Sequence, residues 1–194
     1  MTTRAAFLLQ NLYSGTPANK LAAARRLHTT FASRPPDAQL ASALAKLQEH
    51  SKTLATHMRT LNLGALCTAC ASRPDGGCCS AFMADNVDAV LLLMNLLLGC
   101  DVHPVGTDPA SCQFLDARGC LLAIKPIFCL NYNCRAILNT TPAAGLDMLY
   151  RCAATVLSQQ TQVEELLLAN IHQPETPATE TTPSNPSPAR SPAC

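Results

Sequence analysis

Eight cysteines in the middle of the chain stand in two groups whose spacing could support metal or redox chemistry. The first group has a C-x2-C step followed by a vicinal pair, and the second group is more widely spaced. The eight residues are Cys67, Cys70, Cys78, Cys79, Cys112, Cys120, Cys129 and Cys134. A C-x2-C step lets two thiolates converge on one metal ion, and the Gly76-Gly77 dipeptide lets the backbone fold around a small centre. The pattern therefore predicts a thiolate site drawn from two separate segments.

Metal binding is favoured over two alternative roles for these thiols. Buried structural cysteines usually stand singly on apolar faces, whereas these cluster in a segment rich in Gly and Pro. Transient redox disulfides are the stronger rival. The chain has eleven cysteines, so a complete disulfide framework would leave one of them unpaired. No segment resembles a signal peptide, and we therefore expect a cytoplasmic protein in which the thiols stay reduced.

The spacing of the cysteines favours an iron–sulfur cluster but leaves zinc open. Adjacent side chains of an extended chain point to opposite sides, so Cys78 and Cys79 fit poorly on one tetrahedral zinc ion. The second group also lacks the C-x2-C knuckle that is typical of a zinc ribbon. Iron–sulfur sites accept less regular spacing. Zinc stays open because eight thiolates could form two four-sulfur sites.

The same residues resemble the YkgJ-type cysteine-cluster family, whose members are described as zinc- or iron-chelating domains and to which flagellin lysine N-methylases are similar. The resemblance spans about Cys67 to Cys134. It is carried by C-x2-C…CC, Cys112-Gln-Phe-Leu-Asp-Ala-Arg-Gly-Cys120, Lys125-Pro126-Ile-Phe-Cys129 and Cys134. The resemblance implies a metal site on these cysteines. It does not carry over an activity that needs arginines, because Lys125 and Leu130 stand where the family has Arg.

The composition argues against several other classes of function. Of the 194 residues, 48% are hydrophobic and 14% are charged, and the formal net charge is +1. With only 4% aromatic residues, the chain offers neither the basic field nor the stacking platform of a nucleic-acid-binding protein. The longest apolar stretch, Ala89 to Cys100, is too short to cross a bilayer. Familiar catalytic motifs such as G-x-S-x-G, H-E-x-x-H and the Walker loop are absent from the sequence.

Helical signals dominate the first third of the chain. Thr16-Pro17 can cap and begin a helix, which a double-proline segment ends after Ser33. A second apolar seam with helical spacing follows from Leu40 to Leu61, and Leu63-Gly64 should close it. We expect these two helices to form an antiparallel hairpin, with a short amphipathic piece around residues 5–13 packed against it.

The Cys-rich segment contains one helix and precedes another. Asp85 can cap a helix with the body Val87–Leu98, which Gly99 ends, and its apolar residues on nearly every side predict burial. A last helix should run from Thr141-Pro142 to about residue 171. Residues 172–194 are rich in Pro, Thr and Ser and are expected to be disordered. We therefore expect residues 1–171 to form one mainly α-helical domain, in which the hairpin and the last helix clasp a Cys-rich lobe at 64–140.

Three further residues could be mistaken for members of the site. Cys152 shares a helical face with Leu149 and Val156, so packing in the core is its expected role. Cys100 and His103 flank a turn, and either could join the metal centre. Single residues of these two types are more often structural, and we leave both outside the predicted ligand set.

The sequence thus predicts a non-catalytic metal-binding protein that holds an iron–sulfur cluster or zinc through cysteine thiolates. The alternative is an enzyme that uses the same centre for protein lysine methylation or for thiol or metal redox chemistry. The expected partner is the metal ion, with neither nucleic acid nor membrane among the partners.

Overall fold

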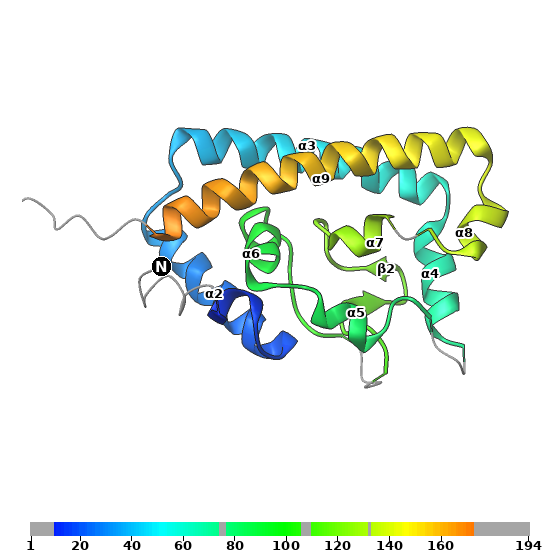
Figure 1. Ribbon diagram of the computed structural model, residues 1–194, viewed down its shortest axis with the longest axis horizontal. Helices are drawn as coiled ribbons and strands as arrows, with labels where there is room; N and C mark the ends of the chain where they lie inside the picture. Colours follow the sequence, from blue (N-terminus) through cyan, green and yellow to red (C-terminus); the bar gives the residue numbers. More distant parts are fainter. Residues whose placement is uncertain (1–9, 74–76, 106–109, 132, 173–194) are drawn as a thin grey trace, which may run out of the picture.

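The computed structural model describes residues 10–73, 77–105, 110–131 and 133–172, which fold mainly into α-helices (Figure 1). The helices are α2 (Pro17–Ser33), α3 (Ala38–Thr60), α4 (Leu63–Ala71), α5 (Ala81–Asp85), α6 (Ala89–Leu97), α7 (Ile127–Asn131), α8 (Arg135–Thr140) and α9 (Ala143–His172). Two short strands, β1 (Leu115–Asp116) and β2 (Gly119–Cys120), pair antiparallel. The mainly helical fold class is therefore confirmed. Residues 1–9 and the predicted tail at 173–194 lie outside the described residues.

Capping residues set the starts of the two N-terminal helices, and α2 begins where the sequence predicts it. The Thr16 hydroxyl accepts a hydrogen bond from the amide of Asn19 at 3.3 Å, and Pro17 occupies the first turn of α2. Asp37 caps α3 by accepting a hydrogen bond from the amide of Leu40 at 2.8 Å. The two prolines between these helices cannot continue α2, so the chain changes direction before α3 begins.

The partners of the two N-terminal helices differ from the predicted hairpin. α3 packs along α9, and these two long helices run antiparallel along one side of the molecule (Figure 1). α2 packs instead against α6. The expected pairing of α2 with α3 is therefore corrected. α3 and α9 each have a long apolar stripe on one face, and the two stripes pack against each other. α6 is apolar on all sides, so a further helix, α2, is needed to cover it.

α6 lies in the core, and its residues from Ala89 to Asn95 are all buried, as predicted. Its N-cap is Asp88, whose carboxylate accepts a hydrogen bond from the amide of Leu91 at 2.8 Å. The prediction that Asp85 caps this helix is wrong, because Asp85 is the last residue of the separate helix α5. Gly99 follows the last turn with a φ of +77°, a conformation that ends helices readily.

The residues from Leu63 to Ala71 form a helix of their own, α4. The prediction that Leu63-Gly64 closes the preceding helix is wrong, because α3 ends at Thr60 and a new helix starts at Leu63. Between the two, Asn62 has a left-handed backbone with a φ of 54°, which asparagine tolerates better than most residues. Cys67 and Cys70 consequently lie three residues apart on one helical face, not in an irregular turn.

One hydrophobic cluster of described residues joins the long helices to the Cys-rich segment. Side chains of α2, α3, α6 and α9 meet buried residues of the segment 114–124 and of the short helices α7 and α8. The α3–α9 pair thus forms the base against which the Cys-rich segment packs (Figure 1). Within the described ranges, no helix combines the length with the apolar character that crossing a membrane requires.

Candidate thiolate site

Backbone pairing brings the two cysteine groups side by side. Ser80 and Ser111 form an isolated antiparallel bridge. Next to it, the amide of Cys112 donates a hydrogen bond to the carbonyl of Cys79 at 3.1 Å. On the other side, the amide of Ala81 donates to the carbonyl oxygen of residue 110 at 2.9 Å. These bonds join segments about 30 residues apart in the sequence, so the start of the second group lies beside the end of the first group.

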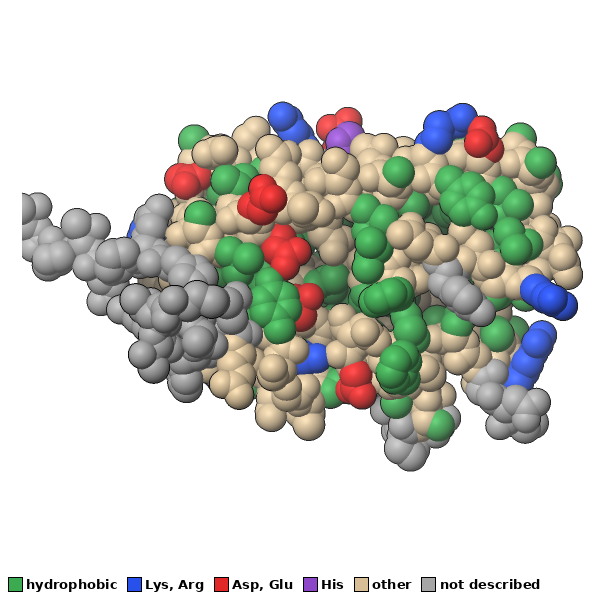
Figure 2. Space-filling model, viewed as in Figure 1, with side chains coloured by type: hydrophobic (Ala, Val, Ile, Leu, Met, Phe, Trp, Pro, Cys, Tyr) green, Lys and Arg blue, Asp and Glu red, His purple; other side chains and the backbone are tan. Residues whose placement is uncertain are grey.

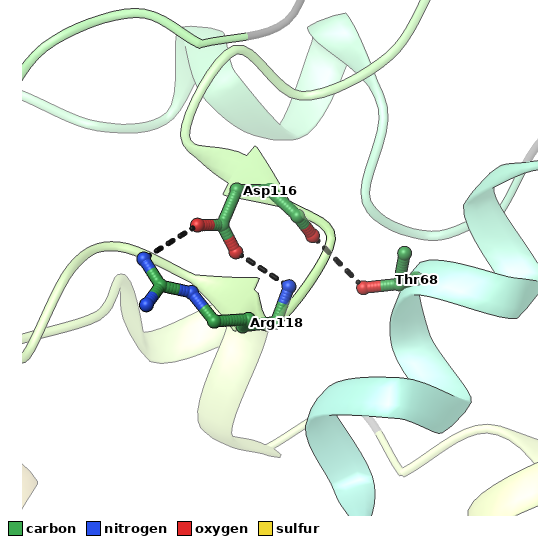
Figure 3. A network of polar contacts seen from close by, with 3 residues as sticks. All are labelled: Thr68, Asp116 and Arg118. Atoms are coloured by element: carbon green, nitrogen blue, oxygen red, sulfur yellow. Dashed lines mark hydrogen bonds and ion pairs between the residues drawn. The ribbon is translucent and has the colours of Figure 1, made fainter.

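Helix α4 is fixed against the β1–β2 hairpin by a polar contact and by a close approach of two backbones. The Thr68 hydroxyl donates to the carbonyl of Asp116 at 3.0 Å, and the Asp116 carboxylate accepts from the backbone amide of Arg118 at 2.7 Å (Figure 3). Gly64 lies so close to the hairpin that an added Cβ atom would stand 2.7 Å from the Arg118 carbonyl. A glycine is needed at this position because a side chain would push α4 away from the strand that carries Cys120.

The side chain of Cys79 lies at the centre of the first group. It forms side-chain hydrogen bonds with both Cys67 and Cys78. The hydrogen bond from Cys79 lowers the pKa of Cys67. It also lowers the pKa of Cys78 to about 6, and the backbone amides of Cys78 and Cys79 add to this effect. The pKa of Cys79 is raised by its bonds to Cys67 and Cys78 and by burial, so Cys79 keeps the proton that it shares with its two neighbours.

The vicinal cysteines do not point apart, as an extended chain would make them do. The prediction of opposite orientations is wrong, because Cys78 and Cys79 lie in a bend and their side chains hydrogen-bond to each other. The added Cβ of Gly77 would stand 3.0 Å from the Cys70 carbonyl, so the bend passes close to the end of α4. The orientation of the pair therefore no longer speaks against binding to a single zinc ion.

The second group adds three sulfurs to the same electrostatic environment. Cys129 is exposed at the surface, but the protein around it removes enough water to raise its pKa to about 12, and the charges of Cys120, Cys112 and Cys78 raise it further. Burial also raises the pKa of Cys112, with a smaller effect from Cys120. Cys120 itself is exposed on β2. The pKa values of Cys112 and Cys129 therefore depend on the charges of neighbouring cysteines.

Lys125 places a positive charge beside both cysteine groups. Its ammonium group lowers the pKa of Cys67 and of Cys129, although in each case it is a minor influence. The ammonium is held in place by a hydrogen bond of 2.5 Å to the carbonyl of Leu122. A cation in this position offsets part of the charge that accumulates when neighbouring thiols ionise.

Six of the eight predicted ligands thus lie in one neighbourhood. They are Cys67, Cys78, Cys79, Cys112, Cys120 and Cys129. The other two are placed differently: Cys70 follows Cys67 by one turn of α4, and Cys134 is the N-cap of α8 and packs against the hydrophobic core. Neither is among the main electrostatic influences on the six.

The thiols are reduced and are not arranged as a finished metal site. Every cysteine that the structure describes is a free thiol. In the described ranges, no three His, Cys, Asp or Glu side chains are positioned so that they could hold a metal ion. The donor type fits a soft metal such as zinc or iron, since thiolates are the preferred ligands of both. Coordination would require the sulfurs to replace their mutual hydrogen bonds with bonds to the metal.

A cavity of about 400 Å³ adjoins the sulfurs. Four cysteines, Cys67, Cys78, Cys79 and Cys129, form part of its wall. Most of the remaining wall is apolar and comes from α3, α4, α5, α7, α8 and α9, with Met58, Leu63, Phe82, Met83, Phe128, Leu130, Ile137 and Leu149 as the apolar residues. The sequence did not predict this cavity, because its wall is assembled from six helices that are separated along the chain.

Two buried polar residues that position the site were not recognised from the sequence. Asn95 of α6 bonds to both backbone groups of Ile124, donating to the carbonyl at 2.9 Å and accepting from the amide at 3.0 Å. Ser51 of α3 donates to the carbonyl of Ala123 at 3.2 Å. Together they fix the segment that leads to Lys125. The available signal was that each is a polar residue within an apolar helical seam.

The three residues left outside the predicted ligand set, Cys100, His103 and Cys152, contact the hydrophobic core or a neighbouring side chain. Cys100 packs against the hydrophobic core, and the imidazole Nδ1 of His103 lies 3.2 Å from a carboxylate oxygen of Asp101. Cys152 also packs against the core, beside the buried residue Leu149. The expectation of core packing for Cys152 is therefore confirmed.

Comparison of the chain with family models, with curated proteins and with solved structures finds no match. The resemblance to the YkgJ-type family is therefore carried by the cysteine pattern alone and stands as a proposal. The features of this protein that bear on its function are the thiols, their hydrogen bonds and the adjoining cavity.

Proposed function

We propose that this protein binds a metal, as an iron–sulfur cluster or as zinc, through thiolates from the two cysteine groups. The observation that carries the proposal is the position of Cys79. Its side chain hydrogen-bonds to Cys67 and Cys78, and its carbonyl accepts the backbone hydrogen bond of Cys112 at 3.1 Å. The Cys79 sulfur thus contacts those of Cys67 and Cys78, directly beside the start of the second group.

The acidity of these thiols supports a role as metal ligands. Only the deprotonated thiolate binds a metal, so ligands whose pKa is lowered lose less free energy on giving up their protons. The pKa of Cys78 is lowered to about 6, and that of Cys67 is also lowered. Backbone amides directed at the Cys78 sulfur are typical of thiolates that bind metals. Metal binding would displace the proton held by Cys79, and the affinity should therefore rise with pH.

Both metals remain compatible with this set of sulfurs. Because Cys78 and Cys79 lie on the same side of the chain, both can serve one centre, as a four-thiolate zinc ion or as a cluster. The irregular spacing of Cys112, Cys120 and Cys129 still favours an iron–sulfur cluster. The resemblance to the YkgJ-type family supports either metal.

The test is metal analysis of the full chain purified anaerobically under reducing conditions, after expression with iron and zinc supplied. We expect a stoichiometric metal content, with a brown colour and visible absorption for an iron–sulfur cluster or no colour for zinc. Cys79→Ser should lose most of the metal. Cys152→Ser is the matched control and should retain the metal, because Cys152 belongs to α9 and packs against the hydrophobic core. A wild-type protein without bound metal, or full occupancy in Cys79→Ser, would contradict the proposal.

Thiol redox chemistry is a second candidate function for the same residues. The contact between the side chains of Cys67 and Cys79 favours it, because two thiols in contact can be oxidised to a disulfide. A disulfide substrate would accept the two electrons and two protons and leave as two thiols. Metal-free protein incubated with oxidised glutathione should then lose two hydrogen masses and gain a Cys67–Cys79 crosslink in peptide mapping. Recovery of the unchanged reduced protein would exclude this role.

A further inference from the structure

The cavity beside the thiols has the size and lining of a site for a small organic molecule. Its volume of about 400 Å³ lies within the range of ligand-binding pockets, roughly 300 to 1,000 Å³. Eight apolar side chains line it, and the described lining residues include no Asp, Glu, Lys or Arg. Because burial of apolar surface against such a wall is favourable, the cavity suits a molecule with an apolar body.

Free thiols distinguish this cavity from an ordinary apolar pocket. The cysteines in its wall are Cys67, Cys78, Cys79 and Cys129. The sulfur of cysteine is a strong nucleophile, so these residues can attack an electrophilic carbon that is held beside them. Holding the two reactants together raises the rate, because their freedom to move apart has already been lost on binding. A molecule that combines an apolar body with an electrophilic carbon would therefore both fill the cavity and react in it.

The lining favours one type of reaction with a thiol. Displacement and acyl transfer release a leaving group that is commonly an anion, and the described lining residues offer no ammonium or guanidinium group to bind it. Conjugate addition to an α,β-unsaturated carbonyl compound releases nothing. The sulfur forms a bond to the β-carbon, the π electrons of the C=C bond move to the α-carbon, and this carbon takes up the proton of the thiol. Atoms and electrons balance without a further reactant.

The rim of the cavity carries exposed aromatic side chains. Phe82 of α5 is 74% exposed and Phe128 of α7 is 58% exposed, although both also line the cavity. Hydrophobic side chains gather on the face of the molecule over α5 and α7 (Figure 2). Met58 and Met83 are half-buried in the wall and are flexible enough to adapt to differently shaped molecules. An apolar tail in the cavity would cover part of the two aromatic rings.

We propose that this cavity binds apolar α,β-unsaturated carbonyl compounds and that a cysteine of its wall adds to them. The apolar wall and the aromatic rim bind the tail of the molecule, and the sulfur forms the covalent bond. The site goes beyond the proposed metal function, because it rests on the cavity and on the free thiols and does not require that the sulfurs hold a metal.

The test uses two vinyl ketones that differ only in their tails. 1-Octen-3-one has a pentyl group where methyl vinyl ketone has a methyl group, and the reactive carbons are the same. Each ketone is incubated with the full-length reduced protein after a chelator has removed any metal, and borohydride reduction then fixes the adducts. Peptide mapping by mass spectrometry gives the rate at each cysteine, which is divided by the rate of the same ketone with glutathione. The ratio of the two normalised rates at one cysteine reports the effect of the tail, because the reactivity of that thiol affects both ketones.

We expect the wall cysteines that react to favour 1-octen-3-one by at least about tenfold. Each buried methylene strengthens binding about fourfold, so complete burial of the four additional methylenes would give up to about two-hundredfold. Cys120, which is exposed on β2 and does not line the cavity, should show a ratio near one. Butylbenzene, which can fill the cavity without reacting, should slow the reaction of the wall cysteines alone. A ratio near one at every wall cysteine, an equal preference at Cys120, or no labelling of the wall would overturn the proposal.

Variants place the tail in the cavity. Met83→Trp adds bulk to the wall and should reduce the preference for 1-octen-3-one severalfold. Met148→Trp, at an exposed position of α9, is the matched control and should keep the preference. Phe82→Ala removes an exposed ring from the rim and should also lower it, which provides a second variant if the tryptophan does not fold.

Circular dichroism and thermal unfolding check that each variant is folded. An unchanged preference in folded Met83→Trp and in folded Phe82→Ala would refute the placement of the tail. Metal content is measured on the same preparations before chelation, so a failure of the metal proposal is recognised separately.

Discussion

Asn95 and Ile124 form a side-chain to backbone pair at the centre of the molecule. The Asn95 side chain is fully buried, and its amide donates to the Ile124 carbonyl while its oxygen accepts from the Ile124 amide. A second bond from the same nitrogen reaches the carbonyl of Leu91 at 2.9 Å. One polar side chain therefore gives an irregular segment the pairing that a neighbouring strand would otherwise provide. This segment leads directly to α7, which carries Cys129.

Asn95→Leu should destabilise the fold strongly. Leucine has a similar volume, but it leaves both backbone groups of Ile124 buried and without partners. Because each unsatisfied buried group costs about 1–3 kcal/mol, we expect the free energy of unfolding to fall by roughly 2–4 kcal/mol. Urea unfolding of the reduced protein measures this change. Asn139→Leu, which is exposed on α8, should change it by less than about 0.5 kcal/mol. Equal unfolding midpoints for wild type and Asn95→Leu would contradict the role given to this side chain.

Gly64→Ala should also be destabilising, although alanine is the better helix former. The gain in helix propensity is at most about 1 kcal/mol. Against it stands a contact of 2.7 Å between the new Cβ and the Arg118 carbonyl, a backbone atom that cannot rotate away. Overpacking of this kind costs about 1–3 kcal/mol, so we expect a net loss of about 1–2 kcal/mol.

The neighbouring residue provides the control for this substitution. Ala65 is exposed on the same helix, and Ala65→Ser should lower the stability by only a few tenths of a kcal/mol. Thermal unfolding compares the two variants. A Gly64→Ala protein that is more stable than wild type would mean that α4 and the hairpin can separate freely, and the close approach would then have no structural importance.

The helices α2, α3, α6 and α9 could be predicted from the sequence because their signals are local, whereas the short helices α4, α5, α7 and α8 were not predicted. Thr16 and Asp37 cap their helices through hydrogen bonds to residues three positions further on, and the apolar seam of α9 is continuous. Helix pairing could not be predicted, since it depends on which apolar faces match in length. The start of α4 was also missed, because it depends on the left-handed backbone of a single residue, Asn62.

The candidate site was only partly predictable, for the same reason. The types and spacing of the cysteines indicated thiol chemistry, and the structure brings six of the eight into one neighbourhood. Their arrangement depends on long-range backbone pairing, such as the bond from Cys112 to Cys79, which no local pattern specifies. The predicted orientation of Cys78 relative to Cys79 was wrong, because adjacent side chains point to opposite sides in an extended chain but not in a bend.

Asp88 should make the stability of the fold depend on pH. Burial raises the pKa of its carboxyl group above the ordinary value of 3.8, and the charge of Glu164 raises it further. Hydrogen bonds from the amides of Leu91 and Val90, and the charge of Lys20, act in the opposite direction. The folded protein therefore binds this proton more tightly than the unfolded chain does. In the pH window between the two pKa values, stability should fall as the pH rises.

Asp88→Asn separates the charge of this residue from its capping role. Asparagine is also a good N-cap, so the variant should keep α6 intact and lose the pH-dependent penalty. Its advantage over wild type should grow as the pH rises above 3.8 and reach a plateau above the folded pKa. Urea unfolding midpoints at a series of pH values measure this. Asp37→Asn, at the exposed cap of α3, is the matched control for replacing a capping carboxylate with an amide. A constant difference between Asp88→Asn and wild type at all pH values would show that burial of the charge has no effect on stability.

The thiols should react with iodoacetamide in an order that reflects their pKa values. In metal-free protein at pH 7, Cys78, with a pKa of about 6, is mostly thiolate, whereas Cys129 has a pKa of about 12. A thiol of that pKa is ionised in only about one molecule in 100,000, which slows its alkylation. Its thiolate is intrinsically more nucleophilic, and this offsets the loss of rate by several hundredfold. Cys78 should therefore be alkylated about a hundredfold faster than Cys129, although both line the same cavity.

Peptide mapping by mass spectrometry follows each site, and the two rates should become equal in denaturant. If Cys129 were labelled as fast as Cys78 in the folded protein, the hydrogen bond from Cys79 could not be what activates Cys78.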